Sequence, residues 1–154
     1  MVEIFKIFQG CLTLLIACIV AYIAIQQYLV NKRKLQLDLF DKRLQIYEEL
    51  ISLLNIIASL PEEKQNNFQI QQFTNDIRNC NNKLTVADFL FEDDEVITYL
   101  KNIRKRSMKT RTAYIQVSNG KNLEKNELIK EEELKWFSKQ FDESRRIFVK
   151  AMKV

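Results

Sequence analysis

The amino-acid sequence predicts an all-α protein in which an N-terminal transmembrane helix continues into an antiparallel cytoplasmic helical bundle. The 154-residue chain contains only two Gly and one Pro, so residues that break helices are rare. An uncharged apolar run lies near the N-terminus, and apolar residues three and four positions apart recur through most of the remaining chain. A chain of this length suits one domain. We therefore expect three long helices and one shorter helix.

The apolar run is the first element. No charged residue occurs from Ile7 to Ile25, and the chain stays uncharged to Val30. As a helix, the stretch from Ile7 to Ile25 would extend about 28 Å, close to the thickness of about 30 Å of a hydrocarbon core. Residues 7–30 are therefore predicted to span a membrane. A cleaved signal sequence, or a lipobox ending at Cys18, is less consistent with the apolar residues that follow Cys18.

Basic residues on the two sides of this run predict its orientation. Lys6 precedes the run and is offset by Glu3, whereas Lys32–Lys34 follow it as an uninterrupted basic triplet. Because Lys and Arg are retained on the cytoplasmic side, residues 1–6 should lie outside and residues 31–154 should form a cytoplasmic domain. The expected location is the bacterial inner membrane.

Small residues follow one face of the predicted span. Small side chains allow two membrane helices to approach closely, which would favour a homo-oligomer, although such residues are also common in any membrane span. The predicted span packing face consists of Gly10, Thr13, Ala17, Ala21 and Ala24.

The helix is expected to continue beyond the basic triplet, since no Gly or Pro follows until Pro61. An apolar seam of the coiled-coil type is predicted there, widened by Leu50, Leu53 and Ile57 into a stripe suited to a bundle. The seam consists of Leu37, Phe40, Leu44, Tyr47, Ile51, Leu54 and Ala58.

Three further helices follow from the same spacing. The third is expected to carry Ser107 and Thr110 within its apolar face, and the last is expected to run unbroken from after the Asn119–Gly120 turn to the C-terminus. The second is marked by Ile70, Phe73, Ile77, Cys80 and Leu84, the third by Val96, Tyr99, Leu100, Ile103, Tyr114 and Val117, and the last by Leu134, Phe137, Phe141, Phe148 and Met152, with Trp136 at the edge of its face.

Three segments carry a family resemblance. They are LDLFDKRLQIYEEL (37–50), FLFEDDEVITYLKNI (89–103) and LKWFSKQFDESRRIFVKAM (134–152). In this order they resemble a widespread group of uncharacterised small bacterial single-span membrane proteins that carry a cytoplasmic helical domain. The resemblance implies a bacterial inner-membrane setting and a helical bundle. It implies no activity, cofactor or functional residue.

The composition argues against an enzyme. The chain has no His, which removes the commonest general base and metal ligand. Its three Cys form no disulfide framework, and no phosphate-binding loop, dinucleotide fingerprint or nucleophile elbow occurs. The acidic residues Glu92–Glu95 lack the Gly and the alternating ligands of a calcium loop. We expect no catalytic residue, no cofactor and no metal.

A basic run in the third predicted helix allows two interpretations. It could bind nucleic acid or anionic lipid, or it could pair with the acidic start of the last helix, Glu127 and Glu131–Glu133. Ion pairing is favoured, and nucleic acid is not expected because aromatic or Gly-rich elements are not interleaved with the charges. The run consists of Lys101, Arg104, Lys105, Arg106, Lys109 and Arg111.

A second basic set is predicted to contact the membrane surface. An up-and-down helix order would bring the end of the last helix back to the bilayer, where each basic residue near anionic headgroups contributes about 1 kcal/mol. The predicted contacts are Lys32, Arg33, Lys34, Arg145, Arg146 and Lys150.

Together these features predict a non-enzymatic, membrane-tethered helical interaction protein that self-associates or binds a cytosolic protein partner. Two alternatives are a bundle that senses a ligand and signals to the membrane span, and a toxin-like membrane effector. A pocket lined by Ser107 and Thr110 would favour ligand sensing, whereas a closed core at these residues would favour the interaction protein.

Overall fold

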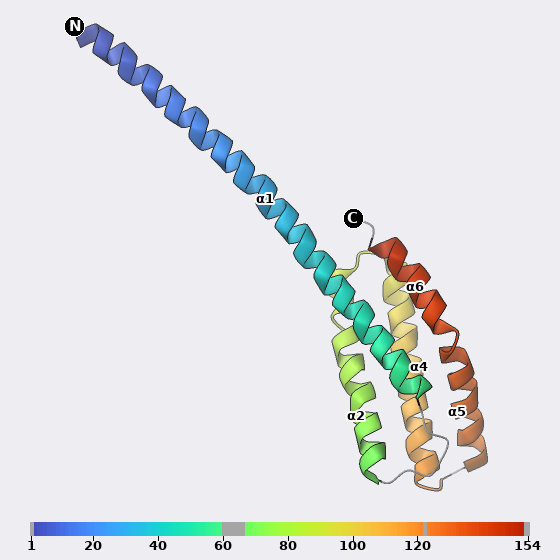
Figure 1. Ribbon diagram of the computed structural model, residues 1–154. Coiled ribbons are helices and arrows are strands. Elements are labelled where there is room, and N and C mark those ends of the chain that lie inside the picture. Colours follow the sequence, from blue (N-terminus) through green and yellow to red (C-terminus); the bar gives the residue numbers. More distant parts are fainter. Residues whose placement is uncertain (1, 60–66, 122, 153–154) are drawn as a thin grey trace. The chain divides into compact units, whose positions relative to one another are not determined.

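The computed structural model describes residues 2–59, 67–121 and 123–152, and it confirms the all-α fold class. Six helices lie in these ranges, and no strand occurs in them. They are α1 (Val2–Ala58), α2 (Asn67–Leu84), α3 (Ala87–Leu90), α4 (Asp94–Ser118), α5 (Leu123–Phe137) and α6 (Gln140–Ala151) (Figure 1). The chain divides into two compact units, Met1–Leu39 and Phe40–Val154.

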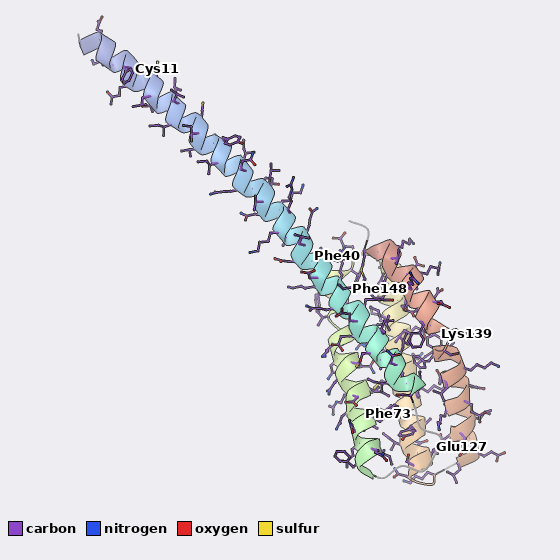
Figure 2. All side chains as sticks on the ribbon, viewed as in Figure 1. Cys11, Phe40, Phe73, Glu127, Lys139 and Phe148 are labelled. Atoms are coloured by element: carbon purple, nitrogen blue, oxygen red, sulfur yellow. The ribbon has the colours of Figure 1, made fainter. Side chains whose placement is uncertain are left out.

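The first unit consists of the N-terminal part of α1. Its apolar side chains from Phe8 to Val30 are exposed, and Figure 2 shows side chains extending from this part of the helix, with Cys11 labelled. The most apolar 18-residue window of α1 has a mean hydropathy of 2.3. By length and composition, α1 is therefore able to cross a membrane. Exposed apolar surface of this extent is unfavourable in water.

The second unit is an antiparallel bundle. Within it α4 packs against α2 on one side and against α5 and α6 on the other, with the last turns of α1 completing the bundle (Figure 1). The core that these helices share includes Leu50, Ile77, Leu100, Phe137 and Phe148. Apolar residues at helical spacing on each element form this core, and their removal from water is its main source of stability.

The buried face of α1 differs from the predicted seam. Leu37 is 64% exposed, Ala58 is also exposed, and Leu44 and Ile51 are only half-buried. Two adjacent apolar stripes share the spacing of three and four residues, and the position of α2, α4 and α6 decides which stripe is enclosed. The residues that are fully or almost fully buried are Ile46, Leu50, Leu53, Leu54 and Ile57. Pro61, which was expected to end this helix, lies outside the described residues.

The predicted apolar faces of the second and third helices are confirmed. In α2, Phe73, Ile77, Cys80 and Leu84 are buried and Ile70 is half-buried. The start of α4 is fixed by a side-chain cap, since the Asp93 carboxylate accepts a hydrogen bond from the backbone N–H of Glu95. The buried residues of α4 are Val96, Leu100, Ile103, Ser107, Thr110, Ala113 and Tyr114.

The end of α4 is a turn at Asn119–Gly120, as predicted. Gly120 adopts φ +69°, a left-handed conformation that is little strained for glycine because glycine has no side chain. Its backbone N–H donates to the carbonyl of Val117 at 2.9 Å. This turn reverses the chain into α5.

The predicted unbroken last helix is wrong, because α5 ends at Phe137 and α6 begins at Gln140. At the break, the N–H of Lys139 donates to the carbonyl of Trp136, three residues back, in place of a regular helical bond. The Ser138 hydroxyl donates to the carbonyl of Lys135, a local bond of the kind that competes with helix continuation. No Gly or Pro marks this position in the sequence.

Candidate interaction site

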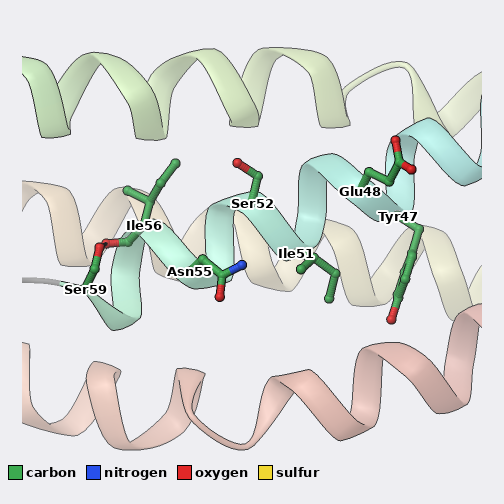
Figure 3. Close-up of a pocket in the computed structure, with 7 residues that line it drawn as sticks. All are labelled: Tyr47, Glu48, Ile51, Ser52, Asn55, Ile56 and Ser59. Carbon is green, nitrogen blue, oxygen red and sulfur yellow. Dashed lines mark hydrogen bonds between the residues drawn. The ribbon is translucent and has the colours of Figure 1, made fainter.

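An open groove lies on the outward face of α1 in the second unit (Figure 3). Ser52 is directed toward α2 (Figure 3), and the centre of the Tyr47 ring lies 5.2 Å from the centre of the Phe148 ring of α6. We call this surface the α1 groove. It is lined by Tyr47, Glu48, Ile51, Ser52, Asn55, Ile56 and Ser59.

The α1 groove combines an apolar floor with a polar rim. Ile51 and Ile56 are half-buried and pack against the core, whereas Ser52 and Asn55 are exposed. Glu48 is the only charged residue in the lining. Such a mixture resembles the surface of protein interfaces, where apolar anchors are surrounded by groups that form hydrogen bonds. Sequence reasoning assigned Ile51 to the buried seam and therefore missed this surface.

Cys80 of α2 is a buried free thiol. Burial raises the pKa of Cys80 above its ordinary value of 9.0, the hydrogen bond with Ser52 lowers it, and the nearby Glu49 carboxylate raises it. The thiol is therefore neutral at physiological pH and is a core residue rather than a nucleophile. The other two cysteines, Cys11 and Cys18, are exposed in the apolar part of α1.

The small polar residues of α4 are enclosed. Ser107 and Thr110 are both 0% exposed. The Ser107 hydroxyl accepts a hydrogen bond from the Asn81 amide at 2.8 Å, and it donates one to the carbonyl of Arg104 at 2.9 Å. The Thr110 hydroxyl donates to the carbonyl of Arg106 at 3.0 Å. Both hydroxyls are thus satisfied within the bundle, so the core is closed at these residues.

A buried carboxylate was not anticipated from the sequence. Glu133 of α5 is 0% exposed, and its Oε1 accepts a hydrogen bond from Lys109 Nζ at 2.8 Å. Its Oε2 lies 3.3 Å from Arg106 Nε, but without the geometry of a hydrogen bond. The Arg106 guanidinium also lies 4.2 Å from the centre of the Trp136 ring, a cation–π contact. In the sequence, the burial of Glu133 is indicated only by its position four residues before the buried Phe137, on the same face of the helix.

The basic run of α4 is therefore divided among different partners. Pairing with the acidic start of the last helix is found for Lys109 and Arg106 with Glu133. Arg111 instead donates to the carbonyl of Thr74 in α2, and Lys101 lies 3.9 Å from Asp88. Arg104 and Lys105 form no ion pair within the described ranges.

The residues predicted to meet the membrane surface are all exposed. Lys32, Arg33 and Lys34 lie on α1, and Arg145 lies on α6. Arg146 pairs with Glu143, and Lys150 pairs with Glu95 at the start of α4. These pairs raise the pKa of Arg146 and of Lys150, chiefly through the hydrogen bonds to Glu143 and Glu95. Contact with headgroups would compete with these partners.

The predicted span packing face is also exposed along its length. The five residues Gly10, Thr13, Ala17, Ala21 and Ala24 all lie in α1. A Cβ atom added at Gly10 would meet no atom within 4 Å, and the Thr13 hydroxyl donates to the carbonyl of Gln9. This face is therefore open for contact with another helix.

Comparison with known proteins gives no relative. No protein-family model matches the chain, and no curated protein sequence or solved structure matches it. Among the residues that the structure describes, no group of three or more His, Cys, Asp or Glu side chains is placed to hold a metal ion.

The stability of the bundle should depend on pH because it buries several hydroxyl and thiol groups whose pKa is raised in the folded state. Burial raises the pKa of Tyr99 above its ordinary value of 10.0, the Glu143 carboxylate raises it further, and a hydrogen bond with Ser144 lowers it. Burial also raises the pKa of Tyr114. Each group binds its proton more tightly in the folded state, so its contribution to stability is complete below the ordinary pKa and is lost as pH rises through the raised pKa.

We therefore expect the free energy of unfolding to fall above pH 9.0, the ordinary pKa of Cys80, and to fall further above pH 10.0, the ordinary pKa of tyrosine. Denaturant unfolding between neutral and alkaline pH would measure this. The Tyr99→Phe variant should lose less stability over the alkaline range than the wild type, whatever its stability at neutral pH. Parallel curves for the two proteins would contradict the assignment to Tyr99.

Proposed function

We propose that this protein is a non-enzymatic, membrane-tethered helical interaction protein of the bacterial inner membrane. One observation carries this function: the bundle is closed at Ser107 and Thr110, while the outward face of α1 presents the open α1 groove. Because both hydroxyls already form hydrogen bonds inside the bundle, they are not available to bind a ligand. The half-buried isoleucines and polar rim of the α1 groove suit contact with the surface of another protein.

The orientation proposed for the chain places the bundle in the cytoplasm. The basic triplet Lys32–Lys34 follows the apolar segment, and Lys6 with Glu3 precedes it, which supports retention of the C-terminal side. A reporter that is active only in the cytoplasm should therefore work when fused after Val154. Activity of a periplasm-only reporter at the same site would reverse the orientation.

The proposed occupant of the α1 groove is a protein, either a second copy of this chain or a cytosolic partner. A second copy is supported by the exposed small residues from Gly10 to Ala24, which would let two spans approach closely. A cytosolic partner is supported by the groove's single charge, Glu48, and by its half-buried apolar floor of Ile51 and Ile56.

Site-specific photo-cross-linking in native membranes would test this function. A photoreactive amino acid in place of Asn55, inside the α1 groove, should give one discrete cross-linked product. The matched control is Asn102, an exposed residue of the same type on α4. A product of twice the chain mass would identify a second copy, and any other product would be identified by mass spectrometry.

A variant then establishes whether the α1 groove is responsible. Asn55→Arg should abolish recovery of the identified protein with a tagged copy, and Asn102→Arg should leave recovery unchanged, since both positions are exposed. Equal cross-linking from both positions, or equal recovery with both variants, would mean that the α1 groove is not an interaction site.

A further inference from the structure

A second groove lies between α2 and α4, which pack side by side in the bundle (Figure 1). Its lining carries four basic residues and no acidic residue. We call it the basic groove, and it shares no residue with the α1 groove. It is lined by Arg78, Asn81, Asn82, Lys101, Arg104, Lys105 and Met108.

The three basic residues of α4 outside the basic groove already have partners. Arg106 and Lys109 face the buried Glu133, and Arg111 donates to a backbone carbonyl of α2. In the basic groove, Lys101 has only a long contact of 3.9 Å with Asp88. Arg78, Arg104 and Lys105 have no ion pair in the described part of the chain. Three of the four basic residues of the basic groove therefore lack a counter-charge among the described residues.

Arg104 adds an unsatisfied hydrogen-bond donor to the positive charge of the basic groove. Its Nε is buried and has no hydrogen-bond partner within the described residues. A buried charged donor without a partner is unfavourable, and native proteins satisfy nearly all such groups. Arg104 also lines the basic groove and is only half-buried as a residue, so its guanidinium group can form charge-assisted hydrogen bonds to an anion bound there.

We propose that the basic groove binds a phosphate-bearing anion. Guanidinium groups bind phosphate oxygens through charge-assisted hydrogen bonds, and lysine ammonium groups add charge. Two arginines and two lysines suit a ligand with at least two negative charges, such as a diphosphate group. The shared chemistry is the phosphate group, whether it belongs to a soluble molecule or to a lipid headgroup. Single-stranded nucleic acid is disfavoured because no aromatic side chain lines the groove for base stacking.

Binding of pyrophosphate by the full-length protein in detergent micelles would test the proposal. Isothermal titration should show binding that weakens as salt increases, since the contacts are ionic. The Arg104→Gln variant should bind about tenfold more weakly or worse, as expected for the loss of a charge-assisted hydrogen bond. Lys105→Gln, at an exposed position, should also weaken binding and provides a variant with little effect on folding.

The matched control is Lys125→Gln, which removes an exposed basic residue of α5 that does not line the basic groove and should leave pyrophosphate binding unchanged. A short-chain, water-soluble phosphatidylglycerol distinguishes the two sources of phosphate. Binding of this lipid without binding of pyrophosphate, lost in Arg104→Gln, would assign the site to a lipid headgroup. Binding of pyrophosphate with the same dependence on Arg104 would assign it to a soluble phosphate.

Three results would overturn the proposal. One is the absence of binding for both ligands, and another is an equal loss in Arg104→Gln and Lys125→Gln. The third is an oligonucleotide that binds more tightly than either ligand and depends on Arg104, because the surface would then recognise nucleic acid.

Discussion

Replacing Leu53 with Asp should unfold the bundle. Leu53 is 0% exposed in the core face of α1, so the carboxylate would be buried without a partner. An uncompensated buried charge costs about 3–5 kcal/mol, a large part of the roughly 5–15 kcal/mol that stabilises a typical domain. Limited proteolysis of the full-length protein in micelles should show rapid cleavage within residues 40–152, whereas the wild-type bundle resists.

Asn55→Asp is the matched control for this substitution. It introduces the same charge two positions along α1, but at an exposed residue, so the bundle should remain resistant to protease. Leu44→Asp, at a half-buried position, should have an intermediate effect. Wild-type protease resistance in Leu53→Asp would show that this face of α1 is not the buried one.

Removing both basic partners of Glu133 should also destabilise the bundle strongly. In Arg106→Ala combined with Lys109→Ala, the Glu133 carboxylate would stay 0% exposed but would lose the two cations that contact it. Breaking a buried pair from one side typically costs about 3–5 kcal/mol. Because Lys109 is half exposed, Lys109→Ala alone should cost less. Denaturant unfolding at neutral pH would measure both differences.

A third substitution distinguishes an unpaired charge from a simple loss of packing. Adding Glu133→Leu to the double variant removes the buried carboxylate and should restore most of the lost stability. The control is Lys105→Ala, which removes a neighbouring cation that has no contact with Glu133 and should change stability little. If Glu133→Leu restores nothing, the lost stability reflects the packing of Arg106 against Trp136 rather than the buried charge.

The sequence by itself determined the helical class, the apolar segment and most helix faces. These features depend on local properties: helix propensity, the near absence of Gly and Pro, and apolar spacing along one segment. The α2 face from Phe73 to Leu84 is confirmed for this reason, as is the α4 face from Val96 to Ile103. The Asn119–Gly120 turn is likewise predicted from residue type, since Gly readily adopts the left-handed conformation that Gly120 has in the structure.

Only the tertiary structure decided which surfaces are enclosed. On α1, adjacent stripes share the same period, and the neighbouring helices bury Leu50 and Leu53 while leaving Ile51 at the edge of an open groove. On α5, contact with Arg106 and Lys109 allows Glu133 to be buried, although its own segment favours exposure. The unpaired groups of the basic groove also emerge only when α2 and α4 are placed side by side. Periodicity describes each helix alone, whereas burial and charge pairing depend on residues distant in sequence, and that is the physical reason for the division.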